Sequence, residues 1–366
     1  FGWTDDIVNA IIHAVDQGAK IISNSWGSTE DSVLIHQAIK YAYEKGVLVI
    51  ASAGNENTSL KKYPAAYPEV IAVAATDIDD KPAAFTNFGN WVEIAAPGVE
   101  VLSTYVGNSY IYLSGTSMSA PHVAGVAALI WSIFPWMSSD QVRAQLQFTS
   151  DDLGTPGFDQ YYGYGRLNAQ KAVEKSPPES ELLIASWQLP EIARPHETLT
   201  VTSTILNFGK RKQNNLEFDF YVNDIPVRRG YIASLSSGST YEMESTFTPE
   251  STGIYNLTVY TKPVVDEVDV ENNRITGTVT VKNPEALQVP EKYGTIQAAI
   301  NNAYAGDTIK LAAGTYQENI SIDKSINIIG EAGKTVIDGC GNGTVIQVFS
   351  CSNVTISGLT ICNGAY

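Results

Sequence analysis

The chain has 366 residues, 44% of them apolar and 17% charged, and this composition excludes a chain that is disordered throughout. At roughly 100–200 residues per domain, the length predicts two or three domains. The net charge is −16 and no basic patch with interleaved aromatics occurs, which argues against a nucleic-acid partner. The longest apolar candidate, residues 123–134, is too short for a transmembrane helix, so we expect no membrane span.

Helical and strand patterns alternate along residues 1–175. Apolar spacing predicts helices at 5–18, 32–45 and 123–133 and strands at 20–25, 47–51 and 70–75. Continuously apolar strands are typical of a parallel sheet that is buried on both faces. We therefore predict an α/β domain with helices on both faces of the sheet and functional loops at the carboxyl ends of its strands.

The pattern changes after a linker at residues 176–180. Short alternating strands are predicted at 198–206, 216–222, 240–247, 254–261 and 274–281, and such runs over residues 181–283 predict a β-sandwich. Residues 284–366 begin with a helical pattern at 296–303. The very short strands that follow are typical of the first coils of a parallel β-helix, and they lie at 308–311, 319–322, 326–329, 335–337, 345–348, 354–356 and 360–362.

All three cysteines lie late in the chain and recur every eleven residues, at Cys340, Cys351 and Cys362. Their position excludes a disulfide-dense architecture and a Cys-based zinc site in the preceding residues. We interpret them as inward-facing core residues rather than as a disulfide or a reactive site. The chain starts at Phe1 without Met and ends at Tyr366 in mid-pattern, so we expect it to be a piece of a longer protein.

A Gly-containing turn in residues 113–125 brings Ser117 to the start of a helix made of small and apolar residues. The unsatisfied N–H groups of a first helical turn favour a developing anion. Pro121 is compatible with this position because we expect its missing N–H to fall within that first turn. Taken alone, Ser117 is better explained as a helix cap.

Two strand ends carry further candidate residues. Asn55 heads the loop after the strand at 47–51, where its amide can donate to an oxygen at the carboxyl edge of the sheet, although an ordinary turn Asn explains it too. Ser25, Trp26 and Gly27 end a neighbouring strand. Their exposed small-residue edge can pair with an extended peptide, main chain to main chain.

Together these stretches resemble the subtilisin-like serine proteases (subtilases, family S8). Residues 115–122, GTSMSAPH, match the nucleophile motif of that family, and residues 53–56 match its oxyanion-hole segment. Further framework segments match at 63–75, 95–99 and 163–169, so the resemblance covers residues 1–175. It implies hydrolysis of a polypeptide substrate through an acyl-enzyme, with no cofactor required for the chemistry.

The resemblance also implies a role for each candidate residue. Ser117 would be the nucleophile, and the Asn55 side-chain amide would hold the oxyanion together with the Ser117 backbone N–H. Glu56 would lie near the pocket for the residue before the cut. The remaining substrate-binding residues would be Ser25, Trp26, Gly27, Ala53 and Gly54.

The departure from the family pattern concerns the other two members of the triad, a His base and an Asp that orients it. In subtilases both precede the region that this chain covers, and the chain contains neither their Asp-Ser/Thr-Gly nor their His-Gly-Thr motif. His122 lies about 140° round the helix from Ser117, so we expect it to point away. Asp5 and Asp6 are interpreted as caps of the first helix. All four histidines are interpreted as structural or surface residues: His13, His36, His122 and His196. We expect an inactive fragment.

Two groups of oxygen atoms are candidates for binding a cation. Asp77, Asp79 and Asp80 form a turn cluster that we interpret as solvated carboxylates rather than as calcium ligands. The carbonyls of residues 65, 67 and 70 match a weak cation site in some relatives. Structural calcium stays an alternative, and no metal site is assigned.

The C-terminal segments resemble two other modules. Residues 181–282 resemble a CARDB-type, immunoglobulin-like module, and residues 286–366 resemble the start of a right-handed β-helix of the pectin-lyase type, without paired carboxylates for sugar chemistry. We predict domains at 1–175, 181–283 and 284–366 in a secreted or surface-attached serine endopeptidase whose accessory modules bind a cell-surface polysaccharide or protein. One alternative is an adhesion or carbohydrate-binding protein with a non-cleaving protease-like domain. Another makes the β-helix the working enzyme.

Overall fold

The computed structural model describes residues 3–190, 192–348, 351 and 353–365, so Phe1 and Tyr366 lie outside the described residues. The chain forms two compact units. The first contains the residues up to Leu189 with Thr200–Ser245 and Asn256–Gly277, and the second contains Pro190–Leu199, Thr246–Tyr255 and the residues from Thr278. These units cut across the three domain ranges, which stay predictions.

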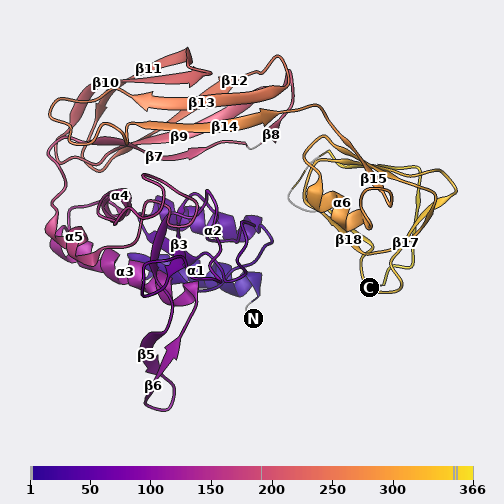
Figure 1. Ribbon diagram of the computed structural model, residues 1–366, viewed down its shortest axis with the longest axis horizontal. Coiled ribbons are helices and arrows are strands. Elements are labelled where there is room, and N and C mark those ends of the chain that lie inside the picture. Colours follow the sequence, from indigo (N-terminus) through magenta and orange to yellow (C-terminus); the bar gives the residue numbers. More distant parts are fainter. Residues whose placement is uncertain (1–2, 191, 349–350, 352, 366) are drawn as a thin grey trace. The chain divides into compact units, whose positions relative to one another are not determined.

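The first unit begins with alternating helices and strands (Figure 1): α1 (Thr4–Asp16), β1 (Ile21–Asn24), α2 (Val33–Glu44), β2 (Leu48–Ser52), β3 (Val70–Thr76) and β4 (Ile94–Pro97). The strands form one parallel sheet in the order β1-β2-β3-β4. Every residue of β2 and β3 is buried, as the predicted two-sided burial requires.

Alternate residues of β2 face two different cores. Leu48 and Ile50 pack in one core with residues of the later helices, whereas Val49 and Ala51 pack in the other with residues of α1 and α2. The period of two along a strand produces this division. The predicted α/β arrangement with helices on both faces of the sheet is confirmed.

The segment after β4 contains a hairpin and three helices: β5 (Val101–Tyr105), β6 (Ser109–Leu113), α3 (Thr116–Ile133), α4 (Ser139–Phe148) and α5 (Ala169–Glu174). The hairpin β5–β6 was not predicted, and in Figure 1 it projects from the α/β part as an arm. Helix α3 begins at Thr116, which confirms that Ser117 lies at the start of a helix and extends the helix predicted at 123–133 toward its N-terminus. Pro121 therefore lies inside the helix and not in its first turn, contrary to the prediction.

The predicted capping role of Asp5 and Asp6 is wrong. The N-cap of α1 is Trp3, which makes no side-chain cap hydrogen bond, and the two aspartates lie within the first turn. Their charges there stabilise the helix through its dipole rather than through a cap.

The sandwich consists of β7 (Leu182–Gln188), β8 (Ile192–Ala193), β9 (Leu199–Asn207), β10 (Gln213–Val222), β11 (Ile225–Leu235), β12 (Thr240–Phe247), β13 (Gly253–Thr261) and β14 (Arg274–Val281). Its sheets have the orders β11-β10-β13-β14-β8 and β12-β9-β7. Phe218 and Phe220 of β10 are fully buried, but Asp219 between them is buried as well and the flanking Glu217 and Tyr221 are half-buried, so the predicted alternation holds only in part in this strand.

In the last segment, the described residues form α6 (Ile296–Asn302) and nine short strands: β15 (Ala286–Val289), β16 (Thr308–Leu311), β17 (Gly314–Gln317), β18 (Ile320–Ile322), β19 (Asn327–Ile329), β20 (Thr335–Asp338), β21 (Ile346–Val348), β22 (Thr355–Ser357) and β23 (Thr360–Cys362). They pair in parallel as β15-β16-β19-β22, β17-β20-β23 and β18-β21. Inward stacking is wrong for Cys340, which is exposed at a turn where its N–H donates to Asp338, while Cys351 and Cys362 are half-buried. Across the described ranges, no helix combines the length and apolar character that a membrane crossing requires.

Candidate active site

Ser117 lies in the first turn of α3 and is half-buried. The chain enters this turn through Gly115, whose φ of 155° is a conformation that favours glycine, and a Cβ there would lie 3.4 Å from Asn55 Nδ2. Within the described part of the chain, no protein group forms a hydrogen bond with the Ser117 hydroxyl. The hydroxyl is therefore presented at a strand-to-helix junction without an internal partner.

Asn55 follows β2, and its side chain contacts Thr116, the residue before Ser117. Its Oδ1 accepts hydrogen bonds from Thr116 N at 2.8 Å and from Thr116 Oγ1 at 3.0 Å. Thr116 Oγ1 in turn accepts from Gly54 N at 3.0 Å. Because the carbonyl oxygen of the Asn55 amide is held in this way, its Nδ2 is left as a donor beside the start of α3.

The Ser117 carbonyl is held by the neighbouring strand end. Ser25 Oγ donates to Ser117 O at 3.1 Å. In a regular helix that carbonyl would accept from the N–H four residues later, which is Pro121 and has no N–H. The serine at the end of β1 therefore supplies the donor that the proline lacks.

Glu56, the candidate residue after Asn55, is the centre of a second hydrogen-bonded group. Glu56 Oε2 accepts from Asn55 N at 3.0 Å and from Asn87 Nδ2 at 2.8 Å, and Glu56 Oε1 lies 3.1 Å from Lys62 Nζ. Asn87 Nδ2 also donates to Ala53 O at 2.9 Å. These contacts fix the loop on which Asn55 lies.

The other predicted substrate-binding positions lie at the two strand ends. Trp26 is half-buried and Gly27 is exposed after β1, while Ala53 is buried and Gly54 is half-buried after β2. Sequence patterns had not indicated Thr116, Lys62 or Asn87. Thr116 lies inside the recognised motif, but Asn87 reaches the site from a distant loop and carries no local pattern.

None of the four histidines bonds to Ser117 in the described residues. His122 Nδ1 contacts its own helix at Met118 O, 2.8 Å away. His36 Nε2 lies 3.0 Å from Glu69 Oε2, and its ring stacks on Tyr67 with centroids 4.0 Å apart. Burial would raise the pKa of Glu69, but His36 outweighs it and holds the pKa below its usual value. These two histidines have structural partners.

No group of three or more His, Cys, Asp or Glu side chains suited to a metal ion occurs within the described residues. Asp77 Oδ1 accepts from the N–H groups of Asp79 and Lys81, and Asp80 pairs with Arg166. The carbonyl of Val70 accepts from Arg143 Nη2 at 3.4 Å. A guanidinium thus already occupies one of the carbonyls considered for a cation.

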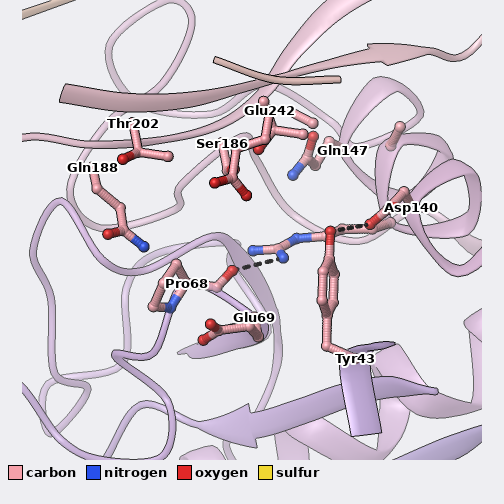
Figure 2. Close-up of a pocket in the computed structure, with 13 residues that line it drawn as sticks. Tyr43, Pro68, Glu69, Asp140, Gln147, Ser186, Gln188, Thr202 and Glu242 are labelled. Carbon is pink, nitrogen blue, oxygen red and sulfur yellow. Dashed lines mark hydrogen bonds between the residues drawn. The ribbon is translucent and has the colours of Figure 1, made fainter. Parts of the chain in front are cut away.

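A cavity of about 100 Å³ is drawn in Figure 2, and Ser117, Asn55 and Thr116 are not among the residues that line it. Figure 2 shows polar side chains from both sides directed toward it, and Tyr43 donates to Asp140 Oδ1 at 3.1 Å. Such a polar lining does not suit an apolar ligand. The lining residues are Tyr43, Pro68, Glu69, Asp140, Arg143, Ala144, Gln147, Ala185, Ser186, Gln188, Thr202, Thr204 and Glu242.

Comparison with known proteins gives two family matches, to the subtilase family over residues 1–165 and to CARDB over residues 179–277. The thermophilic serine proteinase of Bacillus sp. (strain AK1) is 44% identical over 172 residues, 47% of this chain and 42% of that protein. Thermitase of Thermoactinomyces vulgaris is 45% identical over 172 residues, 47% of this chain and 60% of that protein.

The solved prenylagaramide maturation protease PagA is 34% identical, with a TM-score of 0.44, over 47% of this chain and 67% of that one. This chain spans between 42% and 60% of the length of the two curated relatives above. Residues 1–165 are thus similar to the subtilase family of serine peptidases, and residues 179–277 are similar to CARDB.

Proposed function

We propose that residues 1–175 are part of the catalytic domain of a secreted or surface-attached serine endopeptidase. Ser117 Oγ attacks the carbonyl carbon of the scissile peptide bond, and the carbonyl oxygen becomes an oxyanion that accepts from Asn55 Nδ2 and Ser117 N. Collapse of this intermediate breaks the C–N bond and leaves an acyl-enzyme, which water then hydrolyses. The observation that supports the proposal is the pair of hydrogen bonds from Thr116, the residue before Ser117, to Asn55 Oδ1, because they leave the amide nitrogen of Asn55 as the donor.

The proton removed from Ser117 needs a base, which returns it to the leaving amine. We propose that this base and the Asp that orients it belong to a part of the full-length protein outside this 366-residue chain. Two facts support this: His36 and His122 have structural partners, and no described histidine bonds to Ser117. The peptide substrate would lie between the strand ends at 25–27 and 53–54.

The experiment uses the full-length protein and the 366-residue chain side by side. A fluorophosphonate probe should label Ser117 rapidly in the full-length protein, and Ser117→Ala should abolish both labelling and peptide hydrolysis. The shorter chain should label slowly or not at all, because it lacks the base. Peptide hydrolysis that survives Ser117→Ala would overturn the nucleophile assignment.

A second candidate function follows from the same missing base: a surface adhesion or carbohydrate-binding protein with a non-cleaving protease-like domain. The CARDB domain and the parallel strands after residue 284, which we propose to be the start of a right-handed β-helix, would then carry the binding. A full-length protein that binds polysaccharide but never labels at Ser117 would favour this alternative.

A further inference from the structure

An ion pair lies between the two strand ends that we assign to the substrate. Lys62 Nζ lies 3.1 Å from Glu56 Oε1, and the Lys62 side chain is only 16% exposed whereas that of Glu56 is 53% exposed. Neither a helix nor the packing of the core explains why this largely buried lysine places its ammonium between the two strand ends.

The backbone brings Lys62 to the end of β1, and its partner Glu56 lies at the end of β2. Ser28 and Tyr63 exchange two backbone hydrogen bonds, at 2.9 and 2.8 Å, which place the segment before Tyr63 alongside the end of β1. A Cβ on Gly27 would lie 3.9 Å from Lys62 Cβ, and a Cβ on Gly54 would lie 2.8 Å from Glu56 Oε2. The ion pair thus connects Lys62, which lies beside Gly27, with Glu56, which lies beside Gly54.

The two partners differ in how much hydrogen-bonding capacity they have left. Glu56 accepts from three donors: Asn55 N, Asn87 Nδ2 and Lys62 Nζ. Burial would raise the pKa of Glu56, but the hydrogen bonds from Asn87 and Lys62 hold it below its usual value, so the carboxylate is charged and satisfied. The ammonium has three N–H donors, and among the described residues only Glu56 accepts from it.

We propose that Lys62 selects, in the residue that precedes the scissile bond, a side chain with an acceptor oxygen, glutamate before glutamine. This inference rests on the proposed function, because it takes the strand ends at Gly27 and Gly54 as the walls of that subsite. The unused donors of Lys62 bind the incoming carboxylate, while Glu56 stays held by Asn55 and Asn87. A lysine side chain would meet the ammonium and be repelled.

The test measures binding, which needs no catalytic base. Acetylated tetrapeptide amides that differ only in the last residue (Glu, Gln, Leu or Lys) are titrated into the 366-residue chain by calorimetry. The Glu peptide should bind about tenfold more tightly than the Leu peptide, as expected for one charge-assisted hydrogen bond partly screened by solvent, and the Lys peptide should bind most weakly.

Two variants and a control define the role of Lys62. Lys62→Met should remove the tenfold preference for Glu over Leu, whereas Glu56→Gln should increase the affinity for Glu by freeing the ammonium. Lys81→Met changes a lysine on a turn whose side chain is 72% exposed and should alter neither affinity.

The outcomes separate this inference from the proposed function. Equal affinities for Glu and Leu, or a preference that survives Lys62→Met, would overturn the role of Lys62 even if fluorophosphonate labels Ser117 in the full-length protein. A Glu preference lost in Lys62→Met supports the inference even if that labelling fails. If no peptide binds, the inference is wrong.

Discussion

Thr116 holds Asn55 through two hydrogen bonds that end on the same atom, Oδ1, one from its backbone N–H at 2.8 Å and one from its hydroxyl at 3.0 Å. The hydroxyl is also the acceptor for Gly54 N. Thr116 is fully buried, so water cannot replace its hydroxyl. The residue before the proposed nucleophile therefore sets the direction of the proposed oxyanion donor.

Replacing this hydroxyl should impair turnover without weakening substrate binding. In the full-length protein, Thr116→Val removes one bond to Asn55 and leaves Gly54 N unpaired, and we expect kcat to fall about tenfold, the equivalent of one hydrogen bond, with KM nearly unchanged. Thr116→Ser keeps the hydroxyl and should retain most of the activity. Asn55→Ala should cost roughly 10²–10³ in kcat, a magnitude known for a subtilisin rather than derived from this chain. A Thr116→Val variant whose KM rises while kcat stays constant would contradict this role.

Ser25 and Pro121 should be energetically coupled, because both act on the carbonyl of Ser117. We expect Ser25→Ala to lower kcat/KM of the full-length protein by up to about tenfold, since that carbonyl then loses the hydroxyl that donates to it. Pro121→Ala supplies a helical N–H to the same carbonyl, so Ser25→Ala should cost less in the Pro121→Ala background. A double-mutant cycle on kcat/KM measures the coupling, and strictly additive effects would count against it.

The bounds of strands with a clear alternating pattern followed from the sequence. Strands at 240–247, 274–281, 308–311 and 360–362 have the predicted bounds, because polar turns limit each run on both sides. The hairpin β5–β6 was missed because its residues are mostly exposed on both faces, so no apolar alternation marks it. Helix α4 was missed although Ser138 and Gln141 form a capping box, a pattern that the sequence does contain.

The candidate site was predictable only as far as a local motif reaches. Ser117 and Asn55 were identified from the stretches around them, and the structure brings Asn55 to Thr116. The contacts that hold the site could not be predicted, because Asn87 joins Glu56 across 31 positions and Ser25 joins Ser117 across 92. Such pairings depend on the tertiary fold and not on any periodicity.

Asp151 should make the stability of the first unit depend on pH in the acid range. Burial would raise its pKa, but hydrogen bonds from Lys171 and Arg166 outweigh burial and lower the pKa to about 2, against about 3.9 in an unfolded chain. A lowered pKa contributes stability above the unfolded value, and this contribution is lost as the pH falls through about 4 toward 2.

The measurement is the free energy of unfolding in urea between pH 6 and pH 3. Asp151→Asn should be less stable than the unmodified chain at pH 6, and the difference should shrink steadily as the pH falls. Asp266→Asn changes an exposed turn residue and should show no such trend. A difference that is constant over this range would show that the ion pairs of Asp151 do not couple to protonation.

Arg194 should be essential for the connection between the last strand of the sandwich and the segment that follows. Its guanidinium donates to Ala305 O, to Lys282 O and Asn283 O at 3.2 and 3.0 Å, and to Asp307 Oδ1 at 2.6 Å. Asp307 is almost fully buried and also accepts from the N–H groups of residues 285 and 304. One planar group thus satisfies three backbone carbonyls and a buried carboxylate, which an ammonium cannot reproduce.

We expect Arg194→Lys to destabilise the second unit by about 1.5–3 kcal/mol, since charge-assisted hydrogen bonds are lost while the charge is kept. Hydrogen exchange should accelerate at the amides of Glu285 and Tyr304, which depend on a correctly held Asp307. Arg228→Lys, at an exposed position on β11, is the matched control and should change neither quantity. If hydrogen exchange at both amides is unchanged in Arg194→Lys, the backbone N–H groups alone hold Asp307 in place. The arginine would then contribute nothing to the order of this segment.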